Sequence, residues 1–377
     1  MLVPTGRLLI ASNDSRNYNS YKTYWRRWLL LFALVKQPGK MIGLFQAVFL
    51  SIFLLTACGS TQSSTEATQP ETNQATEQRQ NLPEKVTIGY HAHLANFIIA
   101  IEKGFFEDEF SKDGVEVEFV KLEHAGPLID AMKSGDVDLS SSVASFAVSG
   151  IASGADIVIL GTVEASEQSN AVIVPAGSPI KNITDLKGKK IGAVIGSNMH
   201  LVLEAALKEA GLQPGDVQIV PLNPTEGVAA FASGAVDAWA IWDPFRDAAE
   251  LDLGAQTLFV NGPYLTLTDH PVVRRDFHEQ YPQLTKRFLE ALLITDRWMA
   301  ENPDEAQRIS SEANNLKPEV GELSWGRRKF VFRPISEEDR AVFQKVSDFY
   351  VGKGIIKEVL DITPYVDNGP IEEVIAQ

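Results

Sequence analysis

Polar side chains that could hold a small anion follow several apolar runs of this sequence. They lie in four short loops: 90–96 (YHAHLAN), 140–145 (SSSVAS), 195–200 (IGSNMH) and 240–244 (AIWDP). The pairs Ser141-Ser142 and Ser197-Asn198 would set hydroxyl and amide groups beside free backbone N–H groups of helix starts, which suits a small anion. Ordinary helix N-capping is the alternative for either pair taken alone.

Four further side chains in or near these loops could contact a ligand. His91 and His93 could ligate a metal ion, but no Cys, Asp or Glu nearby in the sequence completes a cluster. We therefore expect them to make polar contacts with a ligand, and we expect no metal and no cofactor. Asp243 precedes a proline and Glu164 closes the strand IVILGTVE, so each is either a ligand acceptor or a structural group.

The remaining candidates complete the predicted ligand-binding set. Trp239 and Trp242 alternate along one strand, so one indole is expected in the core and the other, Trp242, at a cleft, with core packing as the alternative for both. His200, from the loop 195–200, and Thr225 are also included in this set. Catalysis is not predicted, because the sequence contains no G-x-S-x-G, P-loop, dinucleotide-binding glycine set or HExxH motif.

Two similar halves are expected to position these loops. Each half from Val86 onward reads as strand, helix, strand, helix, strand, and the pentapeptides SGDVD (134–138) and SGAVD (233–237) each end a helix and begin a strand. Gly135 and Gly234 would supply the left-handed residue that ends the helix. Strands alternating with helices predict an α/β fold with a largely parallel sheet in each half.

The chain after Asn261 changes to a helical pattern. Helices are predicted at 282–301, with apolar spacing at Leu284, Phe288, Leu292 and Ile294, at 303–313, and at 336–350, with a Ser336–Asp339 capping box and a stop at Gly352. These helices would cover the first half. The chain would then cross between the halves twice, near 168–175 and 264–271, which makes a hinge.

Composition excludes one large class of partner. The chain of 377 residues has 34 Lys and Arg against 49 Asp and Glu, a net charge of −15. Residues 1–58 contain seven Lys or Arg and one Asp, so the remainder has a net charge of −21. A body this acidic repels phosphate backbones, so nucleic-acid binding is not expected.

The amino-terminal region has the layout of an export signal. An apolar run at 41–57 follows Lys36 and Lys40 and ends at Cys58, the single cysteine, and the segment LTACGS resembles a bacterial lipobox. Residues 1–57 are predicted to be a leader, Cys58 to be lipidated, and residues 58–83, poor in apolar side chains, to form a flexible tether. An uncleaved membrane anchor is the alternative.

Six segments together carry a resemblance to a known family. They are KGFFEDEF (103–110), GVEVEFV (114–120), GPLIDAMKSGDVDLSSS (126–142), SPIKNITDLKGKKIGAVIGSNMH (178–200), FASGAVDAWAIWDPF (231–245) and FRPISEEDRAVFQKVSDFYVGKGII (332–356). This pattern resembles the substrate-binding proteins of ABC importers for aliphatic sulfonates, taurine and nitrate, from about Val86 to Tyr365. The resemblance implies a two-lobed periplasmic-binding-protein fold of type II, with 84–170 plus 266–377 as lobe I and 171–265 as lobe II.

The resemblance also implies a function. It predicts a monomeric receptor, anchored by lipid outside the bacterial cytoplasmic membrane, that closes over a small anion such as an aliphatic sulfonate or taurine and delivers it to an ABC permease and its ATPase. Nitrate, bicarbonate or a thiamine-precursor pyrimidine is the alternative ligand. An enzyme of the pyrimidine-synthesising type is the alternative of another class, and the lack of a cysteine-rich motif speaks against it.

Overall fold

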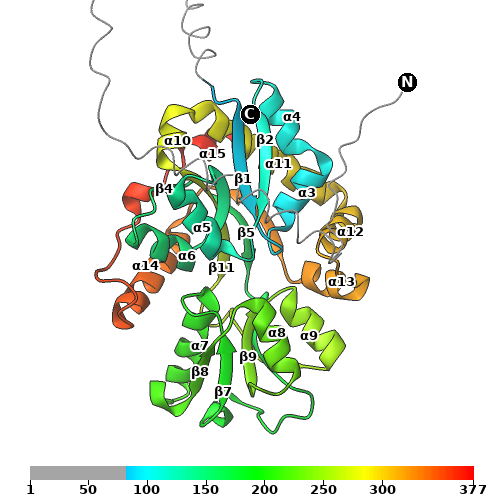
Figure 1. Ribbon diagram of the computed structural model, residues 1–377, viewed down its shortest axis with the longest axis vertical. Helices are drawn as coiled ribbons and strands as arrows, with labels where there is room; N and C mark the ends of the chain where they lie inside the picture. The colour runs from blue at the N-terminus through cyan, green and yellow to red at the C-terminus, as the bar shows by residue number, and fades with distance from the viewer. Residues whose placement is uncertain (1–81) are drawn as a thin grey trace, which may run out of the picture. The chain divides into compact units, whose positions relative to one another are not determined.

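The computed structural model describes residues 82–377 (Figure 1). The predicted leader, the lipidation at Cys58 and the predicted tether as far as residue 81 lie outside the described residues. Among the helices of residues 82–377, none combines the length and the apolar character that crossing a membrane requires.

One sheet has seven strands in the order β12-β5-β11-β3-β1-β2, with β4 also paired to β11. The strands are β1 (Lys85–Tyr90), β2 (Glu116–Lys121), β3 (Leu139–Val143), β4 (Ile157–Ile159), β5 (Thr162–Ser166), β11 (Leu267–Arg274) and β12 (Lys329–Arg333). β1 runs parallel to β2 and β3, whereas β11 is antiparallel to β3, β4 and β5, and β12 is antiparallel to β5. We call this sheet and its helices lobe I.

The second sheet has five strands in the order β10-β6-β9-β7-β8. They are β6 (Asn170–Val174), β7 (Lys190–Ala193), β8 (Gln218–Pro221), β9 (Ala238–Trp242) and β10 (Gln256–Val260). β7 is parallel to β8 and β9, and β6 is antiparallel to β9 and β10. We call this sheet and its helices lobe II.

Both sheets are mixed, so the expectation of largely parallel sheets is corrected. The parallel part of each sheet is the repeated unit that the sequence predicted, with the matching orders β2-β1-β3 and β8-β7-β9. β11 and β6, which run antiparallel to their neighbours, each enter directly from the other lobe rather than through a crossover helix on their own sheet. The predicted strand 157–164 is likewise two strands, β4 and β5, interrupted at Leu160-Gly161.

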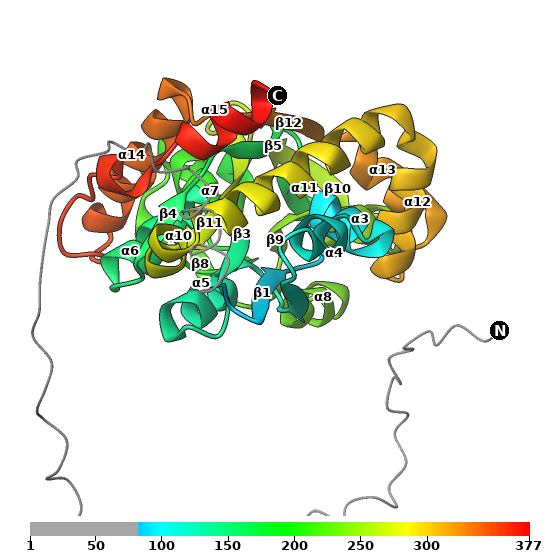
Figure 2. The ribbon, with the colours of Figure 1, turned by 90° about the horizontal axis from the view of Figure 1, so that it is seen from above.

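The helices surround the two sheets (Figures 1 and 2). Those of lobe I are α3 (Ala95–Lys103), α4 (Phe105–Ser111), α5 (Ala125–Ser134), α6 (Ala144–Ala152), α10 (Arg275–Gln280), α11 (Pro282–Glu301), α12 (Pro303–Ala313), α13 (Pro318–Gly326), α14 (Glu337–Gly352) and α15 (Gly369–Ile375). Those of lobe II are α7 (Asn198–Glu209), α8 (Pro224–Ala232) and α9 (Phe245–Leu253). In Figure 2, α3, α4 and α11–α13 lie on one side of the seven-stranded sheet, and α5, α6 and α14 lie on the other.

The carboxy-terminal helices show which sequence signals were sufficient to predict where a helix begins and ends. α11 and α12 begin and end at the predicted residues, because a proline occupies the first position of each helix and cannot continue a preceding one. The capping box of Ser336 and Asp339 at α14 is confirmed. Two details were wrong: Ile294 is exposed rather than on the buried face of α11, and Gly352 is the last residue of α14 rather than its stop.

The repeated pentapeptides have the same structural role in both lobes. Gly135 and Gly234 have φ angles of 88° and 72°, which confirms the predicted left-handed residues. The carboxylates of Asp138 and Asp237 each accept a hydrogen bond of 2.8 Å from a backbone N–H of the middle strand of the parallel unit, β1 in lobe I and β7 in lobe II. Each pentapeptide therefore ends a helix and ties the next strand to its parallel neighbour.

The chain crosses between the lobes at 167–169 and at 261–266, in each case slightly before the predicted place. Asn261, which is fully buried, joins the two crossings: its Nδ2 donates to the Ser166 and Leu265 carbonyls at 2.9 Å, and its Oδ1 accepts from the Asn170 N–H at 3.1 Å. The two connections therefore form one hydrogen-bonded unit. The residue limits predicted for the lobes remain a prediction.

Candidate functional site

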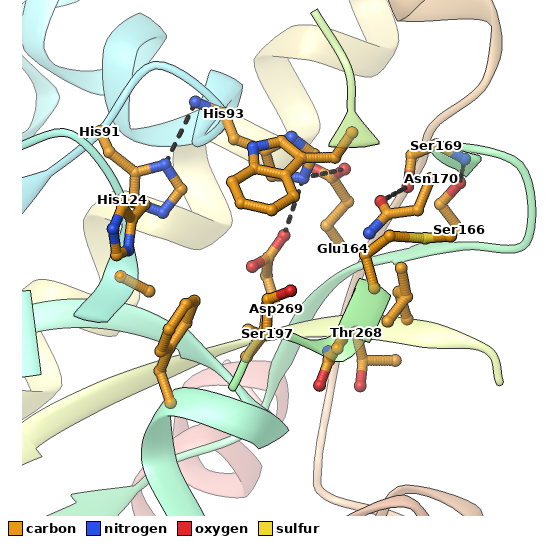
Figure 3. Close-up of a pocket in the computed structure, with 17 residues that line it drawn as sticks. His91, His93, His124, Glu164, Ser166, Ser169, Asn170, Ser197, Thr268 and Asp269 are labelled. Carbon is orange, nitrogen blue, oxygen red and sulfur yellow. Dashed lines mark hydrogen bonds and ion pairs between the residues drawn. The ribbon is translucent and has the colours of Figure 1, made fainter. Parts of the chain in front are cut away.

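A cavity lies where the two lobes meet (Figure 3). The space open to the centres of water molecules measures about 60 Å³. Since one water needs about 10–15 Å³ of such space, the cavity holds roughly four to six waters, or one small organic molecule. Its lining residues are His91, His93, His124, Ala125, Val143, Phe146, Glu164, Ser166, Ser169, Asn170, Ser197, Asn198, Met199, Trp242, Leu267, Thr268 and Asp269.

Three helices begin at this cavity. The residue before the first turn is His124 for α5, Val143 for α6 and Ser197 for α7, and all three line the cavity. The first turn of a helix carries N–H groups without intrahelical partners and the positive end of the helix dipole. One end of the cavity is therefore suited to a compact anion with several oxygen atoms.

The start of α7 also connects the lobes. Ser197 Oγ accepts a hydrogen bond from the His200 N–H at 3.2 Å, which caps the helix. Asn198 Oδ1 accepts from the Ser145 N–H at 3.1 Å, and Ser145 lies in the first turn of α6 in lobe I. The two lobes are thus in direct contact at the edge of the cavity.

The two tryptophans of β9 face opposite sides of their sheet. Trp239 is buried in the core of lobe II, where its ring packs against Phe231. Trp242 is half-buried and lines the cavity. This is the division that the alternation of residues predicted, and it supplies the cavity with one large apolar face.

Ionisable groups of lobe I gather at another part of the cavity wall. His93 Nε2 lies 3.5 Å from Asp269 Oδ2 and 3.6 Å from Glu164 Oε1. Glu164 and Asp269 are both buried and directly opposite each other in the antiparallel pair of β5 and β11. Arg328, which follows α13, places Nη1 3.6 Å from Glu164 Oε2.

The ring of His93 also contacts lobe II. His93 Nδ1 lies 3.0 Å from the backbone carbonyl oxygen of Asp243 and 3.2 Å from Arg328 Nη2. Burial and Arg328 act to lower the pKa of His93, but the carboxylates of Asp269 and Glu164 outweigh them, so this pKa is raised. The Nε2 of His93 is the atom that faces the two carboxylates.

The neighbouring groups respond to burial in different ways. Burial raises the pKa of Glu164 although Arg328 and His93 oppose it. The pKa of Asp269 is lowered, because the hydrogen bond and charge of His93 outweigh burial. Burial lowers the pKa of His91 to about 3, so this ring is neutral and its Nδ1 accepts from the His93 N–H at 3.2 Å.

Six of the eleven predicted ligand-binding residues line the cavity. They are His91, His93, Glu164, Ser197, Asn198 and Trp242. Whether these side chains contact a ligand remains a prediction.

Ser141 and Ser142 do not line the cavity, and their expected place at a helix start is corrected. Both belong to β3, and α6 begins only at Ala144. Ser141 Oγ donates to the His270 carbonyl at 3.0 Å and Ser142 Oγ to the Val143 carbonyl at 3.2 Å. Because β3 is buried between two strands, its hydroxyl groups need partners inside the protein.

The other three predicted residues make contacts away from the cavity lining. His200 Nδ1 accepts from the Gly196 N–H at 3.2 Å. Thr225 Oγ1 donates to Glu123 Oε1 at 3.1 Å on the exposed surface. The carboxylate of Asp243 is fully buried and faces Arg327 rather than the cavity.

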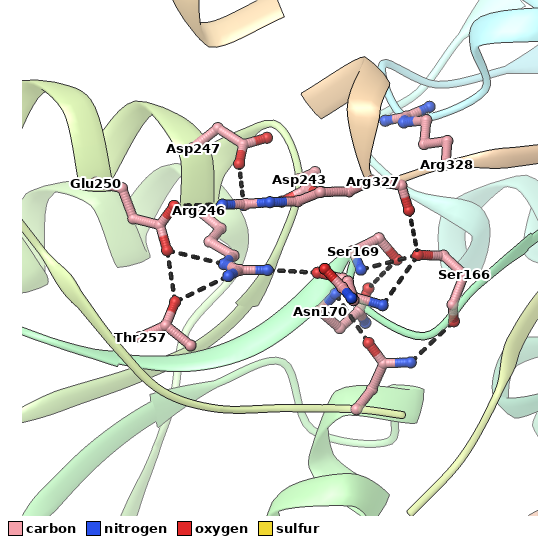
Figure 4. Close-up of polar contacts among 12 residues, drawn as sticks. Ser166, Ser169, Asn170, Asp243, Arg246, Asp247, Glu250, Thr257, Arg327 and Arg328 are labelled. Carbon is pink, nitrogen blue, oxygen red and sulfur yellow. Dashed lines mark hydrogen bonds and ion pairs between the residues drawn. The ribbon is translucent and has the colours of Figure 1, made fainter. Parts of the chain in front are cut away.

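A second charged cluster surrounds Asp243 beside the first crossing (Figure 4). Arg327 of lobe I forms ion pairs with Asp243, Asp247 and Glu250 of lobe II, where the Arg327 Nη2 to Glu250 Oε2 distance is 2.6 Å. Arg246 donates to Thr257 Oγ1 at 2.9 Å and to the carbonyl of the crossing residue 168. This network joins the lobes through buried charges.

The sequence interpretation missed the acidic partners of His93. Asp269 lies 176 positions after His93 in the chain, and only the pairing of β5 with β11 brings it opposite Glu164. The available signal was the pair of ionisable residues Asp269-His270 within a buried strand next to the second crossing. Arg328 and His124 gave no such signal.

Comparison with known proteins finds one family and several relatives. The family described as NMT1/THI5 like matches residues 91–306. A Bacillus subtilis protein named for binding aliphatic sulfonates is 31% identical over 328 residues, 86% of this chain and 95% of that one. The taurine-binding periplasmic protein of Escherichia coli is 30% identical over 231 residues, 58% of this chain and 68% of that one.

A solved structure with the same fold extends over most of the chain. The alkanesulfonate-binding protein SsuA from Xanthomonas axonopodis pv. citri, bound to MOPS, has a TM-score of 0.70 and 25% sequence identity. The similarity covers 76% of this chain and 99% of that one. The described residues therefore have the architecture of that binding protein.

Proposed function

We propose that this chain, which belongs to the NMT1/THI5-like family, is the extracytoplasmic solute receptor of an ABC importer for small sulfonates. The observation that carries the proposal is the meeting of three helix N-termini at one small cavity between two lobes. A sulfonate group presents three oxygen atoms and one negative charge, which such N–H groups can bind.

The relatives support this choice of ligand. Those reported above are named for aliphatic sulfonates, alkanesulfonates and taurine. Trp242 offers an apolar face for the short carbon chain that these compounds share.

Capture follows from the position of the cavity. Because its lining comes from both lobes, a ligand that contacts both stabilises the arrangement in which they touch. The bond of Asn198 to Ser145 forms in that arrangement and adds to it. The closed receptor is then the form presented to the permease.

Titration calorimetry with a panel of anions tests the proposal. The panel contains taurine, ethanesulfonate, nitrate, bicarbonate and a thiamine-precursor pyrimidine, and we expect a sulfonate to bind most tightly, with one molecule per chain. Trp242→Leu should weaken that binding about tenfold, since a buried aromatic contact contributes about 1–2 kcal/mol. The matched control is Trp298→Leu, which alters another half-buried tryptophan on α11, outside the cavity lining. Absence of binding by every sulfonate refutes the proposal.

We also propose that the receptor works without turnover and is anchored by lipid at Cys58. A ligand incubated with the protein should be recovered chemically unchanged. Mass spectrometry of the protein from membranes should find a mature chain that begins at an acylated Cys58. A hydrolysed or rearranged ligand would contradict binding without turnover, and an unmodified Cys58 would contradict the lipid anchor.

A further inference from the structure

Three side chains of lobe I bring potential metal-ligand atoms together at the cavity wall. One nitrogen of His93 and one oxygen each of Glu164 and Asp269 all lie within 4.8 Å of one another. The two distances from His93 Nε2 are 3.5 and 3.6 Å. In a tetrahedral zinc site with bonds of about 2.0–2.2 Å, neighbouring ligand atoms lie about 3.3–3.6 Å apart.

The two carboxylates are not fully satisfied by the protein. Within residues 82–377, Glu164 Oε2 and Asp269 Oδ1 are buried oxygens that lack a hydrogen-bond partner, although Arg328 Nη1 lies 3.6 Å from Glu164 Oε2. They are the second oxygens of the two carboxylates, since Glu164 Oε1 and Asp269 Oδ2 face His93. Their residues are only 2% and 4% exposed. A buried carboxylate oxygen left in this state is costly, so a partner that enters from the cavity would be bound favourably.

The orientation of His93 fits a metal ligand. Its Nδ1 lies 3.0 Å from the Asp243 carbonyl oxygen and 3.2 Å from Arg328 Nη2, and its Nε2 points at the two carboxylates (Figure 3). Histidines that bind metals commonly donate the other ring N–H to a carbonyl or carboxylate, which holds the ring in place. Here the backbone of lobe II supplies that acceptor.

The charge of the cluster favours a cation. A metal ion requires ionised carboxylates and a His93 that has given up its Nε2 proton, and in that state Glu164, Asp269 and Arg328 leave the group with a net charge of −1. Arg328 approaches Glu164 at Oε2, whereas Oε1 is the atom that faces His93. A divalent ion would reverse the sign of this wall and attract an anion into the cavity.

We propose that His93, Glu164 and Asp269 bind a divalent transition-metal ion such as Zn²⁺, with a fourth position open to the cavity. One imidazole nitrogen with two carboxylate oxygens suits zinc better than magnesium or calcium, which prefer oxygen ligands alone. The site does not depend on the sulfonate proposal, because its three ligands lie in lobe I and none belongs to a helix N-terminus.

Calorimetry with ZnCl₂ on protein dialysed against a chelator tests the site. We expect one ion per chain with a Kd of micromolar or below, and about a tenfold or greater loss of affinity in Asp269→Asn and in His93→Gln. The control is His278→Gln, since His278 has a single carboxylate neighbour, Asp367 at 3.1 Å, and should leave zinc affinity unchanged. Circular dichroism establishes that each variant is folded.

Cobalt gives a second readout that needs no variant. Co²⁺ added to the wild-type protein should produce the visible absorption of a four-coordinate ion, and ZnCl₂ should displace it. Absence of zinc binding, or equal binding by Asp269→Asn, His93→Gln and wild type, overturns the proposal. If the chelated protein instead prefers taurine to ethanesulfonate and ignores zinc, the carboxylates serve a ligand ammonium group and the metal site is refuted.

Discussion

Replacing Arg327 by methionine should destabilise the protein more than any exposed ion pair could. Arg327 faces three carboxylates of lobe II, and those of Asp243 and Asp247 are fully buried. Breaking a buried ion pair costs about 3–5 kcal/mol, because it leaves a charge without compensation. We take the lower end, about 3 kcal/mol, because the charge of Arg246 still acts on Asp243 and Asp247 in the variant.

The loss of stability in Arg327→Met should become smaller as pH falls. Burial, aided by Asp247, already raises the pKa of Asp243 well above its usual range, and Arg327 opposes this rise. Without Arg327 the pKa of Asp243 rises further, so the folded variant takes up this proton at a higher pH than the folded wild type does. The stability difference between variant and wild type should therefore shrink as pH falls from neutral toward the ordinary range of an aspartate.

Thermal and urea unfolding of the ligand-free protein measure the effect. At neutral pH a loss of about 3 kcal/mol corresponds to a fall in melting temperature of roughly 6–10 °C. Arg308→Met is the control, since Arg308 and Glu312 form an exposed pair on α12 that is expected to contribute less than about 1 kcal/mol. If Arg327→Met and Arg308→Met melt at the same temperature, or if acid widens the difference, the reasoning about buried charge is wrong.

Three other substitutions test separate features. Arg333 and the capping bonds with Ser336 lower the pKa of Asp339 to about 2. Asp339→Asn should therefore lower the free energy of unfolding by roughly 2 kcal/mol at neutral pH, and in urea unfolding this difference from wild type should vanish as pH falls from 4 through 2. Gly227→Ala would place a Cβ 2.6 Å from the Trp239 ring and should lose about 1–3 kcal/mol in thermal unfolding, whereas Gly215→Ala meets nothing within 4 Å and should not. Asn198→Leu removes a bond between the lobes and should weaken sulfonate binding about three- to tenfold by calorimetry, and unchanged affinity would count against a role in closure.

Local signals in the sequence were sufficient for most of the fold. The prolines at the first positions of α11 and α12, the capping box of α14 and the glycines of the two pentapeptides act within a few residues, so the sequence alone predicts the helix ends they produce. The mixed sheets depend on strands that pair across the chain, such as β11 with β5, and no local pattern contains that register.

The same contrast between local signals and long-range pairing explains which parts of the site were predicted and which were missed. Trp242 and the start of α7 follow from alternation and capping, which are local. The serines of β3 were misplaced, because a hydroxyl group can cap a helix or bond to a carbonyl inside a sheet, and burial decides between the two. Asp269 meets His93 only through tertiary pairing.

The crossings have a consequence for the evolution and engineering of specificity. Lobe II is one uninterrupted stretch of chain whose first and last strands, β6 and β10, are neighbours with Ala171 opposite Val260. A segment whose ends meet in this way can be exchanged between related proteins as a single cassette, with both splice points at adjacent backbone positions. Such a transplant would carry the α7 start and Trp242 into a new scaffold while leaving the acidic wall behind, so each half of the ligand could be selected separately.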